Sequence, residues 1–435
     1  MHSDNVTSSG YAITAPASHP ATACSMRKQM SPCIIALSLL LASAGPGLNG
    51  SEKAQASKII KRYFKEQDPA KRPAILAELE QLDHPSAADL KHFTKLCFKL
   101  VRTSGPKQKG KNPYGCTDRK FGGEYIMRVP SRAKRGSKTG IFFSLHGSGG
   151  SGPGTERHFG MPDSKLICVY PTVTNQRSGW TQPEGERFVL AIIDELKRTY
   201  RIDTNRIFVA GHSMGGFGSW HLGGKHADLF AAAGPMAGGT FGRGVVPNFR
   251  NLPLRVYNAE DDERVKPASS IRAFEQINKE LRPHFGGYPA EFHLYPPKDR
   301  IGHGIPTKHG HDLRSIFQWM LKHTRNPRPD RVVWEPSLAW KRHFYWLRSE
   351  DGRGIIDVQR KGNTFTVAGG RGDLSIELDA RLCDLKKPVI VKLMEDGQTN
   401  EVFNEVPKLS LRVLVESVSI RNDPEMIYLA RIPVR

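Results

Sequence analysis

The chain has 435 residues, 38% of them hydrophobic, which is enough to bury one large core and a second, smaller one. Its formal net charge is +21, but the basic residues are spread along the chain, without zinc-finger spacing, an RNA-recognition signature or a basic helix with interleaved aromatics. The charge therefore indicates a generally basic surface and no nucleic-acid partner, while attraction to an acidic polysaccharide or an anionic membrane surface stays open.

Residues 1–44 have the form of a leader. A polar stretch is followed by the short positive run Met26-Arg27-Lys28, an apolar run over 33–44 and the A-x-A-like triplet Ala42-Ser43-Ala44. This order is typical of a secretory signal peptide. Because the apolar run is too short to cross a bilayer, we expect export to the periplasm or the extracellular space and no stable membrane span.

A helical prefix is expected over 51–105. Apolar residues recur there at helical spacing, as in the groups 59–64, 75–79 and 90–100. Cys97 lies in this prefix, and Cys116, Cys168 and Cys383 follow it; their pairing cannot be deduced from the sequence. For Cys168, which lies in the apolar stretch 166–170, we expect a buried thiol.

The segment 118–325 alternates expected strands and helices. This alternation predicts a mainly parallel sheet with helices on both faces. The expected strands are 124–129, 140–145, 166–170, 206–210, 254–257 and 290–295, and the expected helices are 186–200, 214–225, 269–281 and 311–323.

The pattern changes after Asn326-Pro327-Arg328-Pro329, which ends the last of these helices. Short alternating strands are expected at 343–348, 354–359, 364–368, 374–378 and 388–393, followed by a helix at 409–418 and a strand at 426–434. The sequence therefore predicts a small β-rich accessory domain over 331–435.

The clearest chemical signal is Gly211-His212-Ser213-Met214-Gly215, which follows the β-favouring stretch 206–210 and precedes a segment of small residues with helical potential. A G-x-S-x-G motif between a strand and a helix is the signature of a nucleophile elbow. The serine must then adopt a strained backbone conformation, and side chains two positions before or after it would collide with the neighbouring strand and helix. We therefore predict Ser213 as a nucleophile.

A serine nucleophile also needs donors for an oxyanion. The backbone amide of Met214 is one expected donor, and Ser148 is the other, in the glycine-rich loop 146–152 that follows an apolar strand. The alternative reading of this loop, a phosphate cradle, lacks the Lys-Ser/Thr ending of a P-loop.

The acid and the base should follow the serine in that order. Asp262, after the strand 254–257, is the favoured acid, with its neighbour Asp261 as the rival. His303, flanked by glycines after the strand 290–295, is the favoured base, with His309 and His311 as alternatives.

Residues 121–330 resemble an α/β-hydrolase of the secreted esterase group that includes polyhydroxybutyrate-depolymerase-like and feruloyl-esterase-like proteins. The segments that carry the resemblance are 145–150, 201–207, 211–216 and 302–304. Prolyl-oligopeptidase-type peptidases share much of the same core. The resemblance implies hydrolysis of carboxylic esters through an acyl-enzyme, with no metal and no cofactor. It also implies substrate binding by Trp180, which lies where related esterases carry aromatic pocket residues; packing is the alternative role.

The sequence thus predicts a secreted serine esterase with an α/β-hydrolase domain over 118–325, with acyl groups on polysaccharide as candidate substrates. Two alternatives stay open. One is a serine peptidase of prolyl-oligopeptidase type, and the other is a catalytically idle hydrolase fold used for binding.

Overall fold

The structure is a computed structural model that describes residues 46–82, 84–102, 123–159, 165–173, 179–242, 244–304 and 313–435. The expected leader, Cys116, His309 and His311 lie outside these ranges. Within them, every helix is too short or too polar to cross a membrane.

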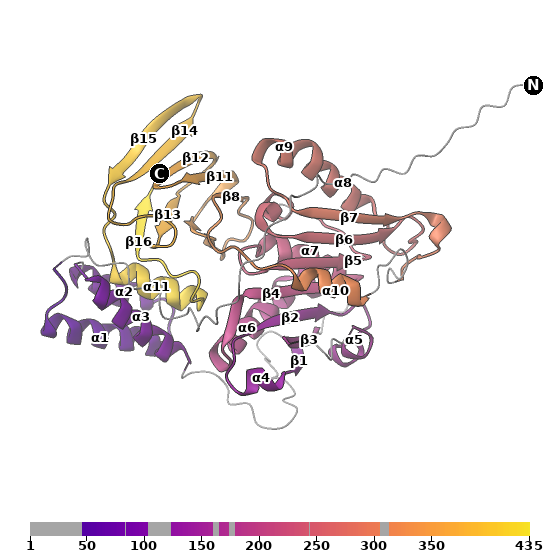
Figure 1. Ribbon diagram of the computed structural model, residues 1–435, viewed down its shortest axis with the longest axis horizontal. Coiled ribbons are helices and arrows are strands. Elements are labelled where there is room, and N and C mark those ends of the chain that lie inside the picture. The colour runs from indigo at the N-terminus through magenta and orange to yellow at the C-terminus, as the bar shows by residue number, and fades with distance from the viewer. Residues whose placement is uncertain are drawn as a thin grey trace, which may run out of the picture. The chain divides into compact units, whose positions relative to one another are not determined.

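A seven-stranded sheet forms the centre of the segment 123–304, in the order β1-β3-β2-β4-β5-β6-β7 (Figure 1). Strand β1 is antiparallel to β3, and all other neighbours are parallel. This confirms the mainly parallel sheet predicted from the sequence. The strands are β1 (Gly123–Arg128), β2 (Thr139–Leu145), β3 (Ile167–Val173), β4 (Ile202–His212), β5 (Ala232–Met236), β6 (Leu254–Ala259) and β7 (Ala290–Tyr295).

Helices connect these strands and cover both faces of the sheet. Phe142 of β2 belongs to one apolar cluster with Ile316 and Met320 of α10. Leu145, which points to the other face, lies against Gly218 of α7. The helices are α4 (Ser131–Lys134), α5 (Gly152–Phe159), α6 (Pro183–Thr199), α7 (Met214–Lys225), α8 (Ala268–Gln276), α9 (Arg282–Phe285) and α10 (Leu313–Leu321), with a π-helical turn at Ile277–Leu281.

Two further sheets form the C-terminal region, as the β-rich pattern predicted. Their strand orders are β16-β13-β10-β9 and β15-β14-β12-β11-β8. The elements are β8 (Arg331–Trp334), β9 (His343–Phe344), β10 (Leu347–Arg348), β11 (Arg353–Lys361), β12 (Thr364–Arg371), β13 (Ser375–Leu378), β14 (Val389–Glu395), β15 (Gln398–Glu405), α11 (Leu411–Arg421) and β16 (Ala430–Pro433). Strands β8 and β15 were not expected from the sequence.

The helical prefix packs against helix α11 of this C-terminal region (Figure 1). The Tyr63 hydroxyl donates a hydrogen bond to Ser419 Oγ at 3.1 Å, and Arg412 pairs with Glu80. The prefix therefore buries its apolar side against a segment from the far end of the chain. Its elements are α1 (Gly50–Lys65), α2 (Arg72–Ala77), a 3₁₀ turn (Glu78–Leu82) and α3 (Ala87–Arg102).

Three described cysteines are buried thiols, namely Cys97, Cys168 and Cys383. The burial of Cys168 confirms the expected core thiol. Burial also raises the pKa of the Cys97 and Cys383 thiols to about 12, so the reactive thiolate is scarce at neutral pH.

Buried charges join the C-terminal region to the domain of the seven-stranded sheet. Arg325 is 4% exposed and donates through Nη2 to Asp423 Oδ2 at 2.8 Å. The Thr204 hydroxyl, on strand β4, donates to the other Asp423 oxygen at 2.6 Å. Nearby, buried Asp228 pairs with Lys341 at 2.8 Å and with Arg421 at 3.4 Å. Each charge therefore depends on a partner from a distant part of the chain.

Replacing Asp423 with alanine is expected to lower the free energy of unfolding by about 3–5 kcal/mol, because it leaves the Arg325 charge buried without its carboxylate. Urea denaturation measures this loss. As a control, Glu275→Ala removes an exposed pair with Lys279 and should cost less than about 0.5 kcal/mol. Equal midpoints for the two variants would contradict the prediction.

The same pair should make stability depend on pH. Burial alone would raise the pKa of Asp423, but the Arg325 and Lys197 charges outweigh burial and hold that pKa below its ordinary range. The contribution of Asp423 is therefore fully present above about pH 4, the unfolded value, and is lost as the pH falls through the lowered folded value. We expect the difference in the free energy of unfolding between the parent and Asp423→Ala to become smaller as the pH is lowered.

Candidate active site

Ser213 occupies the sharp turn between strand β4 and helix α7. Its backbone angles are φ 58° and ψ −119°, a conformation that residues other than glycine rarely adopt. Its N–H donates to the Met236 carbonyl at 2.9 Å, which ties the turn to strand β5. The turn places Ser213 at the N-terminus of α7, where the helix dipole favours negative charge.

The glycines around Ser213 are required by close backbone contacts. A Cβ added to Gly211 would come within 2.5 Å of the Gly215 carbonyl oxygen. One added to Gly215 would come within 2.1 Å of the Leu145 carbonyl oxygen on strand β2. Both distances are too short for real side chains, which confirms the collisions expected of an elbow.

Ser213, His303 and Asp262 form one hydrogen-bonded line. Ser213 Oγ lies 2.9 Å from His303 Nε2, and His303 Nδ1 lies 2.8 Å from Asp262 Oδ2. Asp262 is fully buried, and its Oδ1 accepts the backbone N–H groups of Arg264 and Val265 at 2.9 and 2.8 Å. Because a carboxylate can only accept, His303 carries its proton on Nδ1 and turns the Nε2 lone pair toward the Ser213 hydroxyl.

The rival acid Asp261 has a different contact. Its Oδ1 accepts the backbone N–H of Gly302 at 3.0 Å, which ties down the loop that carries His303. His212 also holds this loop, because its Nε2–H donates to the His303 carbonyl at 3.0 Å. Both side chains thus position the loop.

The expected oxyanion loop lies directly against the serine. A Cβ added to Gly147 would lie 3.4 Å from Ser213 Cβ, and Gly150 closes a tight turn by donating to the Gly147 carbonyl at 3.0 Å. Ser148 and Met214, the two residues whose amides were predicted to bind an oxyanion, both line the cavity beside Ser213.

Buried His146 fixes the base of this loop. Its Nδ1–H donates to the Gly147 carbonyl at 2.8 Å, and its Nε2 accepts the Val173 N–H at 3.2 Å. Burial lowers the pKa of His146, although the bond to Gly147 acts in the opposite direction. The neutral ring that these contacts require is therefore the favoured form.

Trp180 is fully buried beneath the loop. Its indole N–H donates to the His146 carbonyl at 2.9 Å, and the two rings meet edge to face at 5.1 Å. The neighbouring Thr181 contributes to the cavity wall instead. The Trp180 side chain therefore contacts the loop, which agrees with the packing role that the sequence analysis left open beside substrate binding.

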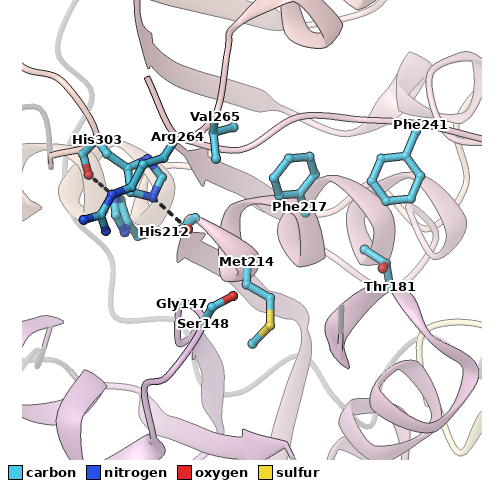
Figure 2. Close-up of a pocket in the computed structure, with 11 residues that line it drawn as sticks. Gly147, Ser148, Thr181, His212, Met214, Phe217, Phe241, Arg264, Val265 and His303 are labelled. Atoms are coloured by element: carbon cyan, nitrogen blue, oxygen red, sulfur yellow. Dashed lines mark hydrogen bonds between the residues drawn. The ribbon is translucent and has the colours of Figure 1, made fainter. Parts of the chain in front are cut away.

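Ser213 and His303 line a cavity of about 640 Å³ (Figure 2). Phe217 and Phe241 lie side by side there with ring centroids 5.8 Å apart, and Phe241 is 60% exposed. Sequence reasoning missed these rings, although Phe217 follows Ser213 by one helical turn and so shares its face of α7. The cavity is lined by Gly147, Ser148, Thr181, His212, Ser213, Met214, Phe217, Phe241, Arg264, Val265 and His303.

Comparison with known proteins gives esterases as relatives, while no family model matches the chain. A bifunctional acetylxylan esterase/xylanase of Neocallimastix patriciarum is 33% identical over 107 residues, 23% of this chain and 16% of that protein. A probable feruloyl esterase C of Aspergillus flavus is 31% identical over 127 residues, 27% of this chain and 46% of that protein. The chain therefore spans less than half the length of either relative.

Among solved structures, a thermostable esterase matches 47% of this chain and 60% of its own, with 24% identity and a TM-score of 0.38. The observed fold does not depend on that match, because the parallel sheet with its strand–turn–helix elbow is seen directly. The chain has an α/β-hydrolase core, and in sequence it resembles the esterases of that superfamily.

Proposed function

We propose that the chain is a serine hydrolase that cleaves carboxylic esters through an acyl-enzyme intermediate. The observation that carries the proposal is the hydrogen-bonded line from buried Asp262 through His303 to Ser213. Its Ser213 end lies in an open cavity. The esterases found as sequence relatives support the same reaction class.

In the proposed first step, Ser213 Oγ attacks the ester carbonyl carbon while His303 Nε2 takes the hydroxyl proton. The carbonyl oxygen becomes an oxyanion, which the backbone N–H groups of Ser148 and Met214 stabilise. The C–O bond to the alcohol then breaks, and His303 gives its proton to the departing oxygen. The Asp262 carboxylate stabilises the imidazolium that exists between these two transfers.

The acyl group now sits on Ser213, and water replaces the alcohol in the second half of the reaction. His303 takes a proton from the water as it attacks the acyl carbon, and then returns that proton to Ser213 Oγ as the acid leaves. Trp180 and His146 do not touch the reacting atoms in this scheme. We propose that they keep the Ser148 amide in place.

Acyl groups on polysaccharide are the proposed substrates. The names of the two relatives, an acetylxylan esterase and a feruloyl esterase, support this class. The signal-peptide pattern supports it too, because an exported enzyme meets polysaccharide outside the cell.

A panel of short p-nitrophenyl esters and dipeptide amides tests the reaction class. We expect burst release of p-nitrophenol as the acyl-enzyme forms, and no comparable cleavage of the amides. Faster cleavage of the amides would favour the peptidase alternative, because the same triad serves both reactions. Turnover of neither would favour the idle binding protein.

A further inference from the structure

The charge of the cavity wall is uneven. Of the described residues that line it, Arg264 alone carries a permanent charge, and none is acidic. The Arg264 side chain is exposed and forms no ion pair with another described residue. Among the described lining residues, a cation with no carboxylate beside it is suited to an anionic group.

The carboxylates next to Arg264 in the chain have other partners. Asp262 bonds to His303, and Asp261 bonds to the Gly302 backbone. Glu263 pairs with Lys266 at 2.8 Å. The chain therefore offers Arg264 no carboxylate from these three neighbours.

Arg264 belongs to the side of the cavity where the alcohol part of an ester must lie. In the proposed mechanism His303 protonates the departing alcohol oxygen, so the alcohol lies beside the imidazole. The Arg264 backbone bonds to the same Asp262 carboxylate that holds His303. Arg264 and His303 both line the cavity, and in the view of Figure 2 Phe217 and Phe241 lie away from them.

We propose, on the basis of the function proposed above, that Arg264 binds a carboxylate on the alcohol part of the ester. The substrate class is then an acyl ester of an acidic sugar, in which the acylated residue or its neighbour carries a free carboxylate. A guanidinium binds a carboxylate through two parallel hydrogen bonds, which fixes orientation as well as charge. The net charge of +21 adds a long-range attraction for such a polyanion.

A matched pair of substrates tests the assignment. O-acetylated galacturonate oligomers are prepared with their carboxylates either free or methyl-esterified, and acetate release gives kcat/KM for each. The parent should prefer the free-carboxylate form. Arg264→Gln should lower the ratio of the two values by about ten- to a hundredfold, the contribution of one charge-assisted pair. Arg264→Lys, which keeps the charge and loses the planar fork, should keep part of the preference.

Arg272→Gln is the control. Arg272 lies on helix α8, is exposed and does not line the cavity, so this variant removes the same charge elsewhere. Its ratio should stay within about twofold of the parent, because distant surface charges are largely screened by salt. An equal fall in both variants, or no fall in Arg264→Gln, would overturn the assignment.

Calorimetric binding of the free-carboxylate oligomer to Ser213→Ala, with and without Arg264→Gln, separates the two proposals. If the parent hydrolyses the oligomers but the ratio is independent of Arg264, the ester hydrolase stands and the carboxylate site fails. If neither the oligomers nor p-nitrophenyl esters are hydrolysed but oligomer binding weakens at least about tenfold without Arg264, the carboxylate site stands and the hydrolase fails. If no ester is hydrolysed and binding is independent of Arg264, both the ester hydrolase and the carboxylate site are overturned.

Discussion

Ser213→Ala is expected to lower ester turnover by about five to six powers of ten, the loss seen when a serine-triad nucleophile is removed. Without Oγ, no acyl-enzyme can form, and only the oxyanion donors and substrate binding remain to accelerate attack by water. Alanine keeps the Cβ of serine, so the strained turn at φ 58° is unchanged and the variant should fold. Turnover of p-nitrophenyl acetate measures the effect, and urea denaturation checks the fold.

A fluorophosphonate probe gives an independent readout. It should label the parent at Ser213 and leave Ser213→Ala unlabelled, because the probe reacts with an activated serine. Ser131→Ala, which changes an exposed serine on helix α4, should be labelled like the parent. Labelling at another residue, or turnover retained in Ser213→Ala, would exclude Ser213 as the nucleophile.

Asp262→Asn is expected to lower kcat by about four powers of ten, the loss reported when a triad carboxylate becomes an amide. Asp262 Oδ1 accepts two backbone N–H groups, those of Arg264 and Val265. An asparagine must keep its oxygen there, so its NH₂ group faces His303 Nδ1. His303 Nδ1 must then accept a hydrogen bond from this NH₂ group, so the imidazole proton moves to Nε2. A protonated Nε2 can no longer take the proton of the Ser213 hydroxyl.

Asp261→Asn is the matched control. The asparagine oxygen can still accept the Gly302 N–H that Asp261 accepts now, so turnover should fall less than about tenfold. A large loss in Asp261→Asn with little loss in Asp262→Asn would assign the acid to Asp261. Both variants are measured on one short ester at neutral pH.

Local patterns were enough to predict most elements of the core. Helix α7 runs from Met214 to Lys225 and strand β7 from Ala290 to Tyr295, both as expected from the sequence. Strand β5 was missed because Ala-Ala-Gly-Pro-Met contains turn-forming residues and has no large apolar side chain before Met236. The glycine at its centre is explained by a distant contact, since a Cβ on Gly234 would lie 3.0 Å from Met320 Sδ of helix α10.

In the candidate site, too, local sequence patterns could not predict features that depend on contacts between distant residues. The elbow could be identified because its strand, glycines and helix are consecutive in sequence. Asp261 and Asp262 are adjacent and chemically identical, and only the turn that directs Oδ1 of Asp262 to two backbone amides separates them. Trp180 could not be assigned to the cavity or the core from sequence, because its hydrogen bond is to a loop more than 30 positions away.

The prefix is synthesised long before helix α11, on which it packs. Tyr63 and Ser419, which are hydrogen-bonded in the structure, are 356 positions apart. At about 5–20 residues per second, roughly 20 to 70 s separate the synthesis of the two. During that interval the prefix has no α11 to cover its apolar side, so the nascent chain exposes it to chaperones and to other nascent chains. A ribosome that stalls before residue 411 would therefore release a chain whose first helices lack their partner.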